Sequence, residues 1–306
     1  MFEDLSIIIP AYNEEKNIVF IYEKIKAVLE QYSYELIFID DGSSDSTFDE
    51  ITKIAKVDNR VKGISFSRNF GHQIALLAGI KKASKNLIVM MDADGQHPPE
   101  LIPDLIQKSC DGFDIVNTRR LSTKGIGWFK RLSSRMYYRI LNGLTDIRIE
   151  YASSDFRLLT RKAANAFLEM EEQNRFTRGM ISWMGFKQAI IEYDAKERFA
   201  GNSKYTLRKM FRFATEGITS FSVKPLKISF YIGLIALFVG SLYAAYAIVV
   251  FLLGKTVMGW TSTLLTILFL GGIQLLGIGI LGEYTAKIYN EIKKRPHYFI
   301  KDECGF

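Results

Sequence analysis

Two long segments without a charged residue constrain the fold of this chain more than any other feature. They run from 228 to 254 and from 256 to 282, and each is long enough to cross about 30 Å of hydrocarbon as a helix. Uncharged apolar runs of this length are rare in soluble folds, where the alternative is two helices buried in a core. We therefore expect two transmembrane helices, at about 228–253 and 261–283, joined by a short turn.

The charges beside these segments predict their orientation. Basic residues flank the pair on the two sides that lead to the rest of the chain, whereas only Lys255 lies between the segments. The positive-inside rule therefore predicts a multi-pass protein of the inner or plasma membrane with the part before the spans and both termini in the cytoplasm. The flanking cations are Arg208, Lys209, Arg212, Lys224 and Lys227 before the first segment and Lys287, Lys293, Lys294 and Arg295 after the second.

The residues around the spans also indicate partners. From Lys204 to Ala214, cations alternate with Leu, Met and Phe at near-helical spacing, which predicts a helix in the headgroup plane or, alternatively, an amphipathic helix packed on a core. The formal net charge is +7, without zinc-finger spacing or an RNA-binding aromatic motif, so we expect a membrane and a lipid phosphate as partners and no nucleic acid. Glycines between 271 and 282 predict close helix packing and a homo-oligomer.

The first 200 residues have the alternating pattern of an α/β domain. Apolar runs at 6–10, 35–39, 61–66, 87–91 and 114–117 predict strands, and 14–31, 47–56, 71–83 and 100–109 have helical periodicity. Strands that alternate with helices favour a mostly parallel sheet covered on both faces. We divide the chain into an α/β domain at 1–200, a juxtamembrane segment at 201–227, two spans at 228–284 and a C-terminal tail at 285–306.

The apolar run at 87–91 ends abruptly in Asp92, Asp94 and Gln96. Such a run predicts a strand buried on both faces, and open α/β sheets bind ligands beyond the carboxyl ends of their strands. Because residues i and i+2 of an extended segment point to the same side, Asp92 and Asp94 can share one Mg²⁺ or Mn²⁺ ion and the diphosphate that it carries. The alternative is a polar strand exit with Asp as a turn former. His97 is expected to have a structural role.

Two further strand ends carry polar residues, at 10–15 and at 40–45. Asp41 can accept hydrogen bonds from a nucleobase N–H or from ribose hydroxyls, whereas Asn13 and Asp45 are expected as helix N-caps. The α/β part at 1–200 contains neither a Gly-x-Gly-x-x-Gly motif nor a Gly-Lys-Ser/Thr phosphate loop. Carboxylates in place of such a loop indicate that a diphosphate is held through a metal ion.

Taken in order, these motifs resemble those of the inverting family 2 glycosyltransferases with the GT-A fold. The resemblance rests on IIIPAYNE at 7–14, DDGSSD at 40–45, RNFG at 68–71 and DADGQH at 92–97. SDFR at 154–157, RFAGNSKY at 198–205 and the paired terminal spans are similar to the polyprenyl-phosphate branch, in particular the bactoprenol glucosyltransferase type, which commonly has Gly where this chain has Ser154. The resemblance implies a Rossmann-like, mostly parallel GT-A domain followed by a two-helix transmembrane hairpin.

The resemblance also implies roles for individual residues. A metal ion is expected at Asp94 and Gln96, and the catalytic residues are expected to be Asp94, Asp155 and Arg157. The nucleotide-sugar site comprises Pro10, Tyr12, Glu14, Asp41, Asp92, Arg198 and Lys204. A basic and hydroxylic cluster suited to a phosphate contains Arg119, Arg120, Lys130, Arg131, Ser134 and Arg135, with a solvated basic helix face as the alternative for part of it. Within it, Arg119, Lys130, Arg131 and Ser134 are expected to bind the acceptor phosphate.

The expected reaction is the inverting transfer of a hexose from a nucleotide sugar to undecaprenyl phosphate or a similar polyprenyl phosphate. UDP-glucose is the first choice of donor, and GDP-mannose or another UDP-sugar is the alternative. A phosphate monoester with a second pKa of about 6 is largely dianionic at neutral pH, so no strong base is needed, and Asp155 either removes a proton or positions a substrate. A processive synthase is disfavoured because no Gln-x-x-Arg-Trp motif occurs. Outside the enzyme class, the alternative is a non-catalytic, nucleotide-sugar-binding membrane scaffold.

Overall fold

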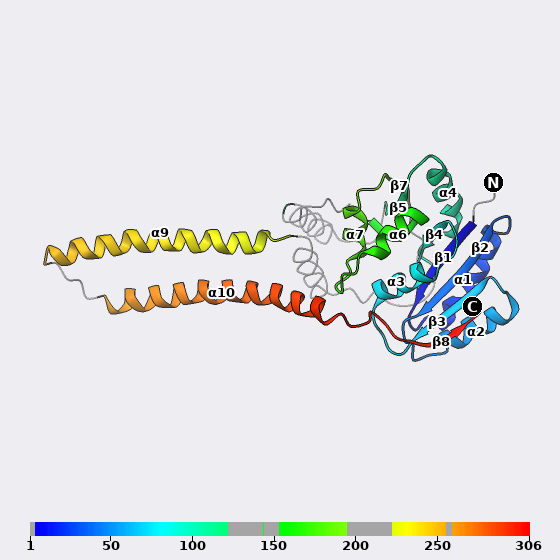
Figure 1. The fold of residues 1–306 in the computed structure, drawn as a ribbon, viewed down its shortest axis with the longest axis horizontal. Helices are drawn as coiled ribbons and strands as arrows, with labels where there is room; N and C mark the ends of the chain where they lie inside the picture. The colour runs from blue at the N-terminus through cyan, green and yellow to red at the C-terminus, as the bar shows by residue number, and fades with distance from the viewer. Residues whose placement is uncertain (1–3, 122–142, 144–152, 195–221, 255–258) are drawn as a thin grey trace.

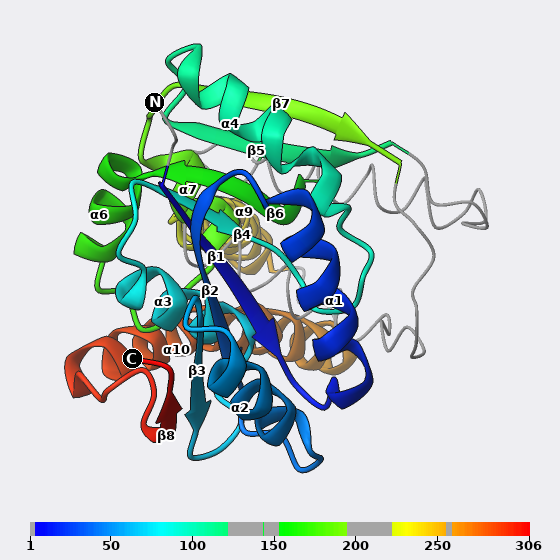
Figure 2. The same ribbon diagram turned by 90° about the vertical axis from the view of Figure 1, so that its right-hand side faces the viewer.

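The computed structural model describes residues 4–121, 143, 153–194, 222–254 and 259–306. Within them, eight strands form one sheet in the order β7-β5-β6-β4-β1-β2-β3-β8 (Figures 1 and 2). The strands are β1 (Asp4–Ala11), β2 (Ser33–Asp40), β3 (Val61–Phe66), β4 (Leu87–Met90), β5 (Ile115–Arg120), β6 (Ser153–Thr160), β7 (Gln188–Tyr193) and β8 (Ile300–Cys304). The helices on the sheet are α1 (Glu15–Val28), α2 (Thr47–Val57), α3 (His72–Lys82), α4 (Ile102–Cys110) after the short turn η1 (Pro99–Leu101), α6 (Arg161–Glu169) and α7 (Thr177–Trp183).

The predicted alternation of strands and helices is confirmed in the centre of the sheet. β1 pairs in parallel with β2 and β4, and β2 pairs in parallel with β3. Successive side chains of β1 enter opposite cores: Ile7 and Ile9 pack with α1, α2 and α4, whereas Ile8 packs with α3, α6 and α7, so helices cover both faces (Figure 2). The run from Leu87 to Met91 is buried throughout, as a doubly covered strand requires.

Three strands, β6, β7 and β8, are not predicted by the sequence pattern. β6 lies antiparallel between β4 and β5, with Arg157 opposite Met90. β7 then pairs in parallel with β5. Because β6 runs against β4, the beginning of β6 lies beside the carboxyl end of β4. This pairing brings Asp155 to the same edge of the sheet as Asp92, although the two residues are far apart in the sequence.

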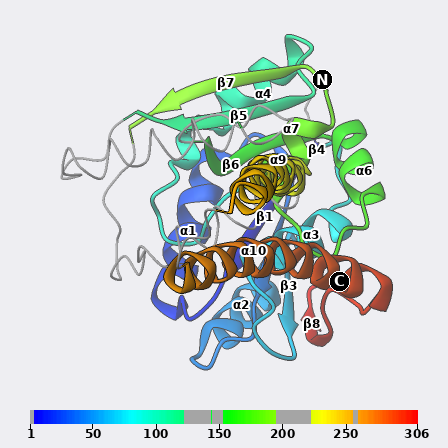
Figure 3. The same cartoon turned by 90° about the vertical axis from the view of Figure 1, so that its left-hand side faces the viewer.

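The two apolar segments form the long helices α9 (Lys224–Leu252) and α10 (Trp260–Lys293), which run side by side and project away from the sheet (Figures 1 and 3). Two stretches within them, Lys224–Leu252 and Leu265–Lys293, are long and apolar enough to cross a membrane, with mean hydropathies of 2.3 and 2.1. In each helix, no residue of the most apolar stretch is buried inside the structure. This exposure contradicts the alternative of two core helices and agrees with the expected hairpin.

The segment after α10 returns to the sheet. The backbone N–H of Ser67 donates to the carbonyl of Phe299 at 3.0 Å, Tyr298 stacks on Phe66 with 4.9 Å between ring centroids, and β8 pairs antiparallel with β3. We expected a tail over 285–306, but α10 continues to Lys293 and the last strand covers the edge of the sheet. The amphipathic segment at 201–227 lies largely outside the described residues, so its division from the domain stays a prediction.

Candidate active site

The loops after β1 and β2 are hydrogen-bonded to each other at the carboxyl end of the sheet. Asn13 has a left-handed backbone, with φ 56°, and its side-chain oxygen accepts the N–H of Ser44 at 2.9 Å. It is therefore not the expected helix cap, and the N-cap position of α1 belongs to Glu14. Asp45 fits its prediction better, because its carboxylate accepts the first N–H of α2, that of Thr47, at 3.1 Å, although the N-cap position is the next residue.

Asp41 connects the loop after β2 to the segment before α3. Its buried carboxylate accepts the backbone N–H groups of Phe70 at 2.7 Å and of Gly71 at 2.9 Å. Burial raises the pKa of Asp41, although the two N–H donors oppose the rise. The structure thus gives Asp41 a role in holding the RNFG segment, which the sequence did not predict. Its contact with a nucleotide stays a prediction.

Three other nucleotide-sugar candidates surround the end of β1. Pro10 is buried within the strand, and Tyr12, just beyond it, is 48% exposed. The side chain of Tyr12 is therefore accessible for stacking, whereas Pro10 shapes the backbone. Glu14 opens α1, where its backbone N–H donates to Thr47 Oγ1 at 2.9 Å and its carboxylate accepts from Asn17.

His97 fixes the loop that follows β4, in the structural role expected of it. Its Nδ1 accepts the backbone N–H of Asp92 at 2.9 Å, so Nε2 carries the proton of the neutral ring and lies 2.8 Å from Ser154 Oγ on β6. The ring also stacks on Phe156, with 5.3 Å between centroids. Ser154 receives a further hydrogen bond, at 3.3 Å, from the hydroxyl of Tyr193. A glycine in place of Ser154 would lack the hydroxyl that contacts both His97 and Tyr193.

Asp94 and Gln96 form the turn of the same loop. The N–H of Gln96 donates to Asp94 Oδ1 at 3.0 Å, and the amide oxygen of Gln96 accepts from Arg120 Nη1 at 3.4 Å. In the described part of the chain, no three His, Cys, Asp or Glu residues gather as a complete metal cage. The oxygen donors still fit Mg²⁺ or Mn²⁺, because Mg²⁺ commonly takes one or two carboxylates and completes its shell with substrate phosphates and water.

Asp155, at the beginning of β6, is the centre of a charged cluster. Arg178 of α7 donates to both of its oxygens, Nε to Oδ1 at 3.0 Å and Nη2 to Oδ2 at 3.1 Å. Arg157 lies 3.3 Å from Oδ1, and its side chain is almost fully buried. The Nε2 atom of His72, at the start of α3, lies 3.7 Å from Asp155 and 3.5 Å from Asp92. The cluster therefore joins the ends of β4 and β6 to two helices.

The cluster keeps Asp155 ionised. Burial by itself opposes ionisation, but Arg178, with smaller contributions from His72 and Arg157, outweighs it and holds the pKa of Asp155 well below its usual range. Burial lowers the pKa of Arg157 to about 10, so this side chain stays cationic near neutral pH. A carboxylate held in this way is a poor proton acceptor and a good anchor for cations.

The acceptor-phosphate candidates are only partly described. Arg119 is ion-paired with Glu192 on β7, so a phosphate contact at this residue requires that pair to open. Its neighbour Arg120 points to the other face of β5 and reaches Gln96 instead. The remaining candidates lie outside the described residues, and their roles stay predictions: Lys130, Arg131 and Ser134 for the acceptor, and Arg198 and Lys204 for the donor.

Sequence reasoning missed three residues of this site: His72, Arg120 and Arg178. His72 had a signal, because it directly follows the RNFG motif and is one of only 3 histidines in the chain. Arg120 was part of a basic cluster, but nothing assigned it to the loop after β4. Arg178 had no signal, since its contact with Asp155 depends on how α7 packs against β6.

Comparison with known proteins identifies the chain. Residues 6–168 match the model of Glycosyl transferase family 2, and residues 224–288 match the GtrB C-terminal hairpin. The chain belongs to glycosyl transferase family 2. The family confirms a GT-A-like glycosyltransferase with an apolar C-terminal hairpin. The assignment of the strand ends described above to its active site stays a prediction.

Individual relatives match over nearly the whole chain. The Bacillus subtilis (strain 168) protein "Uncharacterized glycosyltransferase YkcC" is 44% identical, covering 98% of this chain and 94% of the relative. "Bactoprenol glucosyl transferase" of Shigella phage SfV is 41% identical, covering 98% of both chains. Among solved structures, glucosyl-3-phosphoglycerate synthase from Mycobacterium tuberculosis in complex with Mn²⁺ and UDP-glucose has a TM-score of 0.48 at 17% identity, covering 71% of this chain and 77% of that chain. That structural similarity is too low to support an inference about this family 2 chain.

Proposed function

We propose that this chain transfers glucose, with inversion, from UDP-glucose to undecaprenyl phosphate or a related polyprenyl phosphate at the cytosolic membrane face. The relatives named for bactoprenol glucosyl transfer support the acceptor class and the sugar. One structural observation carries the proposal: the Asp92–Gln96 loop of β4 meets the Asp155–Arg178 pair of β6 and α7 on a chain with an exposed apolar hairpin.

The reaction places few demands on acid–base chemistry. An oxygen of the acceptor phosphate forms a bond to the anomeric carbon, the bond from that carbon to the diphosphate oxygen breaks, and its electron pair leaves with the nucleoside diphosphate. Attack from the face opposite the leaving group gives inversion. Because the acceptor is already a dianion at neutral pH, positioning and charge stabilisation contribute more than deprotonation.

The residues divide this work between them. Asp94 and Gln96 hold the divalent ion, which when bound neutralises charge on the departing diphosphate. Asp155 acts as a positioning residue: it holds Arg178 and Arg157 in place and does not take a proton. Tyr12, at the end of β1, provides an exposed ring for the nucleoside.

The hairpin anchors the enzyme where its lipid substrate lies. The cations on both sides of the hairpin support a cytosolic location of the GT-A domain and of both termini. On α10, Gly277 faces Ser229 of α9, with 3.0 Å from an added Cβ to the serine Oγ, whereas Gly271, Gly272 and Gly279 have no neighbour within 4 Å among the described residues. These open glycines support a homo-oligomer formed through the spans.

The test is transfer of labelled sugar to extractable lipid by the purified full-length protein, with undecaprenyl phosphate and Mg²⁺ or Mn²⁺. UDP-glucose, UDP-N-acetylglucosamine, UDP-galactose and GDP-mannose are compared as donors. We expect metal-dependent glycolipid from UDP-glucose. Product from another donor alone would reassign the sugar, and nucleotide binding without any product would favour the non-catalytic scaffold.

A further inference from the structure

The cytosolic end of α10 is hydrogen-bonded to the loop that leads to Arg178. The carboxylate of Glu291 accepts the backbone N–H of Gln173 at 2.9 Å from Oε1 and 3.1 Å from Oε2, and the N–H of Asn174 lies 3.5 Å from Oε1. Hydrogen bonds to an ionised carboxylate are stronger than neutral ones. The last turns of the second span are therefore bonded directly to a loop of the GT-A domain.

A second contact fixes the other side of this loop. The guanidinium of Arg175 is buried and donates to the carbonyls of Met170 at 2.7 Å and Phe167 at 3.2 Å, and it lies 4.7 Å from the centroid of the Phe167 ring. The loop is thus held to α6 by Arg175 and to α10 by Glu291.

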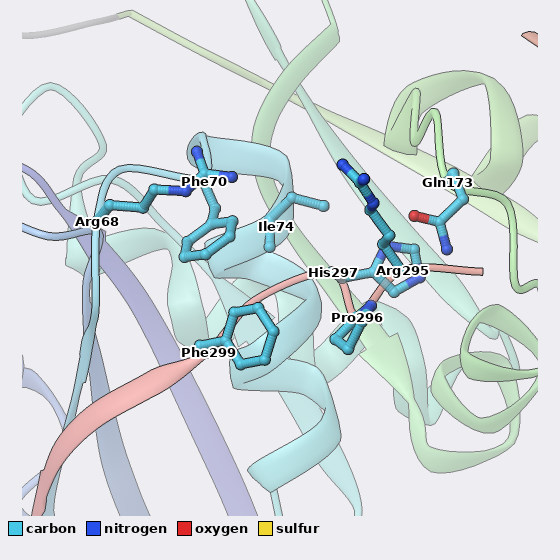
Figure 4. A pocket seen from close by; sticks show the side chains of 8 residues that line it. All are labelled: Arg68, Phe70, Ile74, Gln173, Arg295, Pro296, His297 and Phe299. Atoms are coloured by element: carbon cyan, nitrogen blue, oxygen red, sulfur yellow. The ribbon is translucent and has the colours of Figure 1, made fainter. Parts of the chain in front are cut away.

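The segment after α10 packs beside the same loop. Gln173 lies next to Arg295 and His297, and together with Phe70 and Ile74 of the α3 region they line one cavity of about 550 Å³ (Figure 4). Loop, helix end and C-terminal segment therefore meet at one junction. A shift of α10 at this junction has to move the loop or break the hydrogen bonds of Glu291.

The chain from this junction to the catalytic cluster is short. Gln173 is followed within five residues by Arg178, which lies in the first turn of α7 and makes the two-bond pair with Asp155. The backbone between Gln173, whose amide is bonded to Glu291, and Arg178, whose guanidinium is bonded to Asp155, is therefore too short to move independently at its two ends. We propose that Glu291 is a positioning residue for sugar transfer: it ties the membrane helix α10 to the 173–178 segment and so sets the place of Arg178 at Asp155. This inference rests on the proposed function, because it assigns Arg178 to the transfer site.

The test compares E291L, E291Q and E283Q in the full-length protein in lipid nanodiscs. Glu283 is a matched control, because it is a carboxylate on the same helix without a hydrogen bond or ion pair among the described residues. We expect E291L to lower kcat between about 10- and 100-fold with the donor KM nearly unchanged, since small displacements of catalytic groups cost rate rather than binding. E291Q, which keeps one acceptor oxygen, should recover most of the loss, and E283Q should match the parent protein.

Hydrogen–deuterium exchange supplies a readout that does not depend on activity. E291L should speed exchange at the amides of Gln173 and Asn174, and E283Q should leave it unchanged. Parent-like exchange in E291L, or equal kcat for E291L and E283Q, overturns the proposal. If E291L does not fold, amide exchange in E291Q decides instead: the loss of one carboxylate oxygen should speed exchange at Gln173, and parent-like exchange overturns the proposal. An inactive parent protein with fast exchange in E291L would contradict the proposed function while leaving the Glu291 tether intact.

Discussion

Arg178 and Asp155, 23 residues apart, form a two-bond pair in which Nε and Nη2 of the guanidinium lie 3.0 and 3.1 Å from the two carboxylate oxygens. This parallel geometry orients a guanidinium more rigidly than a single ion pair does. Because both oxygens of Asp155 face cations, the pair holds the pKa of this carboxylate well below its usual range, which supports the proposed positioning role over that of a base.

Removal of either partner should therefore have nearly the same effect. We expect R178Q and D155N each to lower kcat by about 100-fold or more, and the double variant to be hardly worse, because groups that act as one unit are strongly non-additive. Kinetics of the three variants with the lipid acceptor, with thermal melting as a control for folding, measure this coupling. Additive losses would mean that the two residues act separately.

R178K tests the bidentate geometry itself. Lysine keeps the positive charge but lacks the planar fork, so we expect it to restore folding more fully than kcat. A fully active R178K would show that charge alone is sufficient at this position.

Removing the Asp94 carboxylate from the loop after β4 should cause a loss of transfer activity that is linked to the metal ion. D94N should lower transfer by at least about 100-fold, because the carboxylate proposed to hold the metal is gone, whereas folding and membrane insertion stay intact. The measurement is activity against Mg²⁺ and Mn²⁺ concentration. D104N is the control, since Asp104 is an exposed residue of α4. Near-native activity of D94N with unchanged metal dependence would contradict the assignment.

His72 joins the two acidic strand ends, at 3.5 Å from Asp92 and 3.7 Å from Asp155. We expect H72A to lower kcat by roughly 10-fold, since two carboxylates from neighbouring strands lose the ring between them. H72Q, which keeps a polar side chain of similar length between the two carboxylates, should be less affected. Steady-state kinetics against both substrates checks this order, and equal activity of H72A and the parent protein would remove His72 from the site.

On the acid side of the pH–rate profile, the fall in rate should come from protonation of the acceptor phosphate. The pKa of Asp155 lies well below its usual range, so the carboxylate is ionised from pH 5 upward and its contribution to stability is lost only as the pH falls below about 4. The acceptor phosphate loses its second charge below about pH 6, so the rate should fall there as the pH decreases. A phosphonate acceptor, whose second pKa is higher, should move this limb upward. If the acid limb stays at the same pH with the phosphonate, a group of the protein and not the acceptor causes it.

Gly42 should tolerate no side chain. A Cβ at this residue would lie 2.4 Å from the backbone carbon of Arg68, and φ is +70°, so G42A must both strain the turn and push away the segment that Asp41 holds. We expect a loss of at least about 2 kcal/mol in stability and weaker donor binding. Gly112 is the control, because its φ is +85° but its added Cβ meets only Lys187 Nζ at 4.0 Å. Equal melting temperatures for G42A and G112A would show that the contact with Arg68 does not matter.

Local patterns in the sequence were sufficient for the hairpin and for the centre of the sheet. The uncharged lengths of 228–254 and 256–282 predict spans, and the buried run at 87–91 places Asp92, Asp94 and Gln96 at a strand end. Both signals depend only on which residues follow one another. The periodicity of a strand or helix is a local property, and so these parts of the fold and site were predicted.

The remaining contacts were decided by tertiary structure. The antiparallel pairing of β6 with β4 puts Asp155 beside Asp92, the packing of α7 supplies Arg178, and Glu291 reaches the loop before α7 across 118 residues of sequence. None of these contacts has a local sequence signal, because each pairs groups whose separation in the chain is unrelated to their separation in space. The sequence by itself determined which chemistry each strand end offers, and only the packing of the sheet decided which of those groups meet.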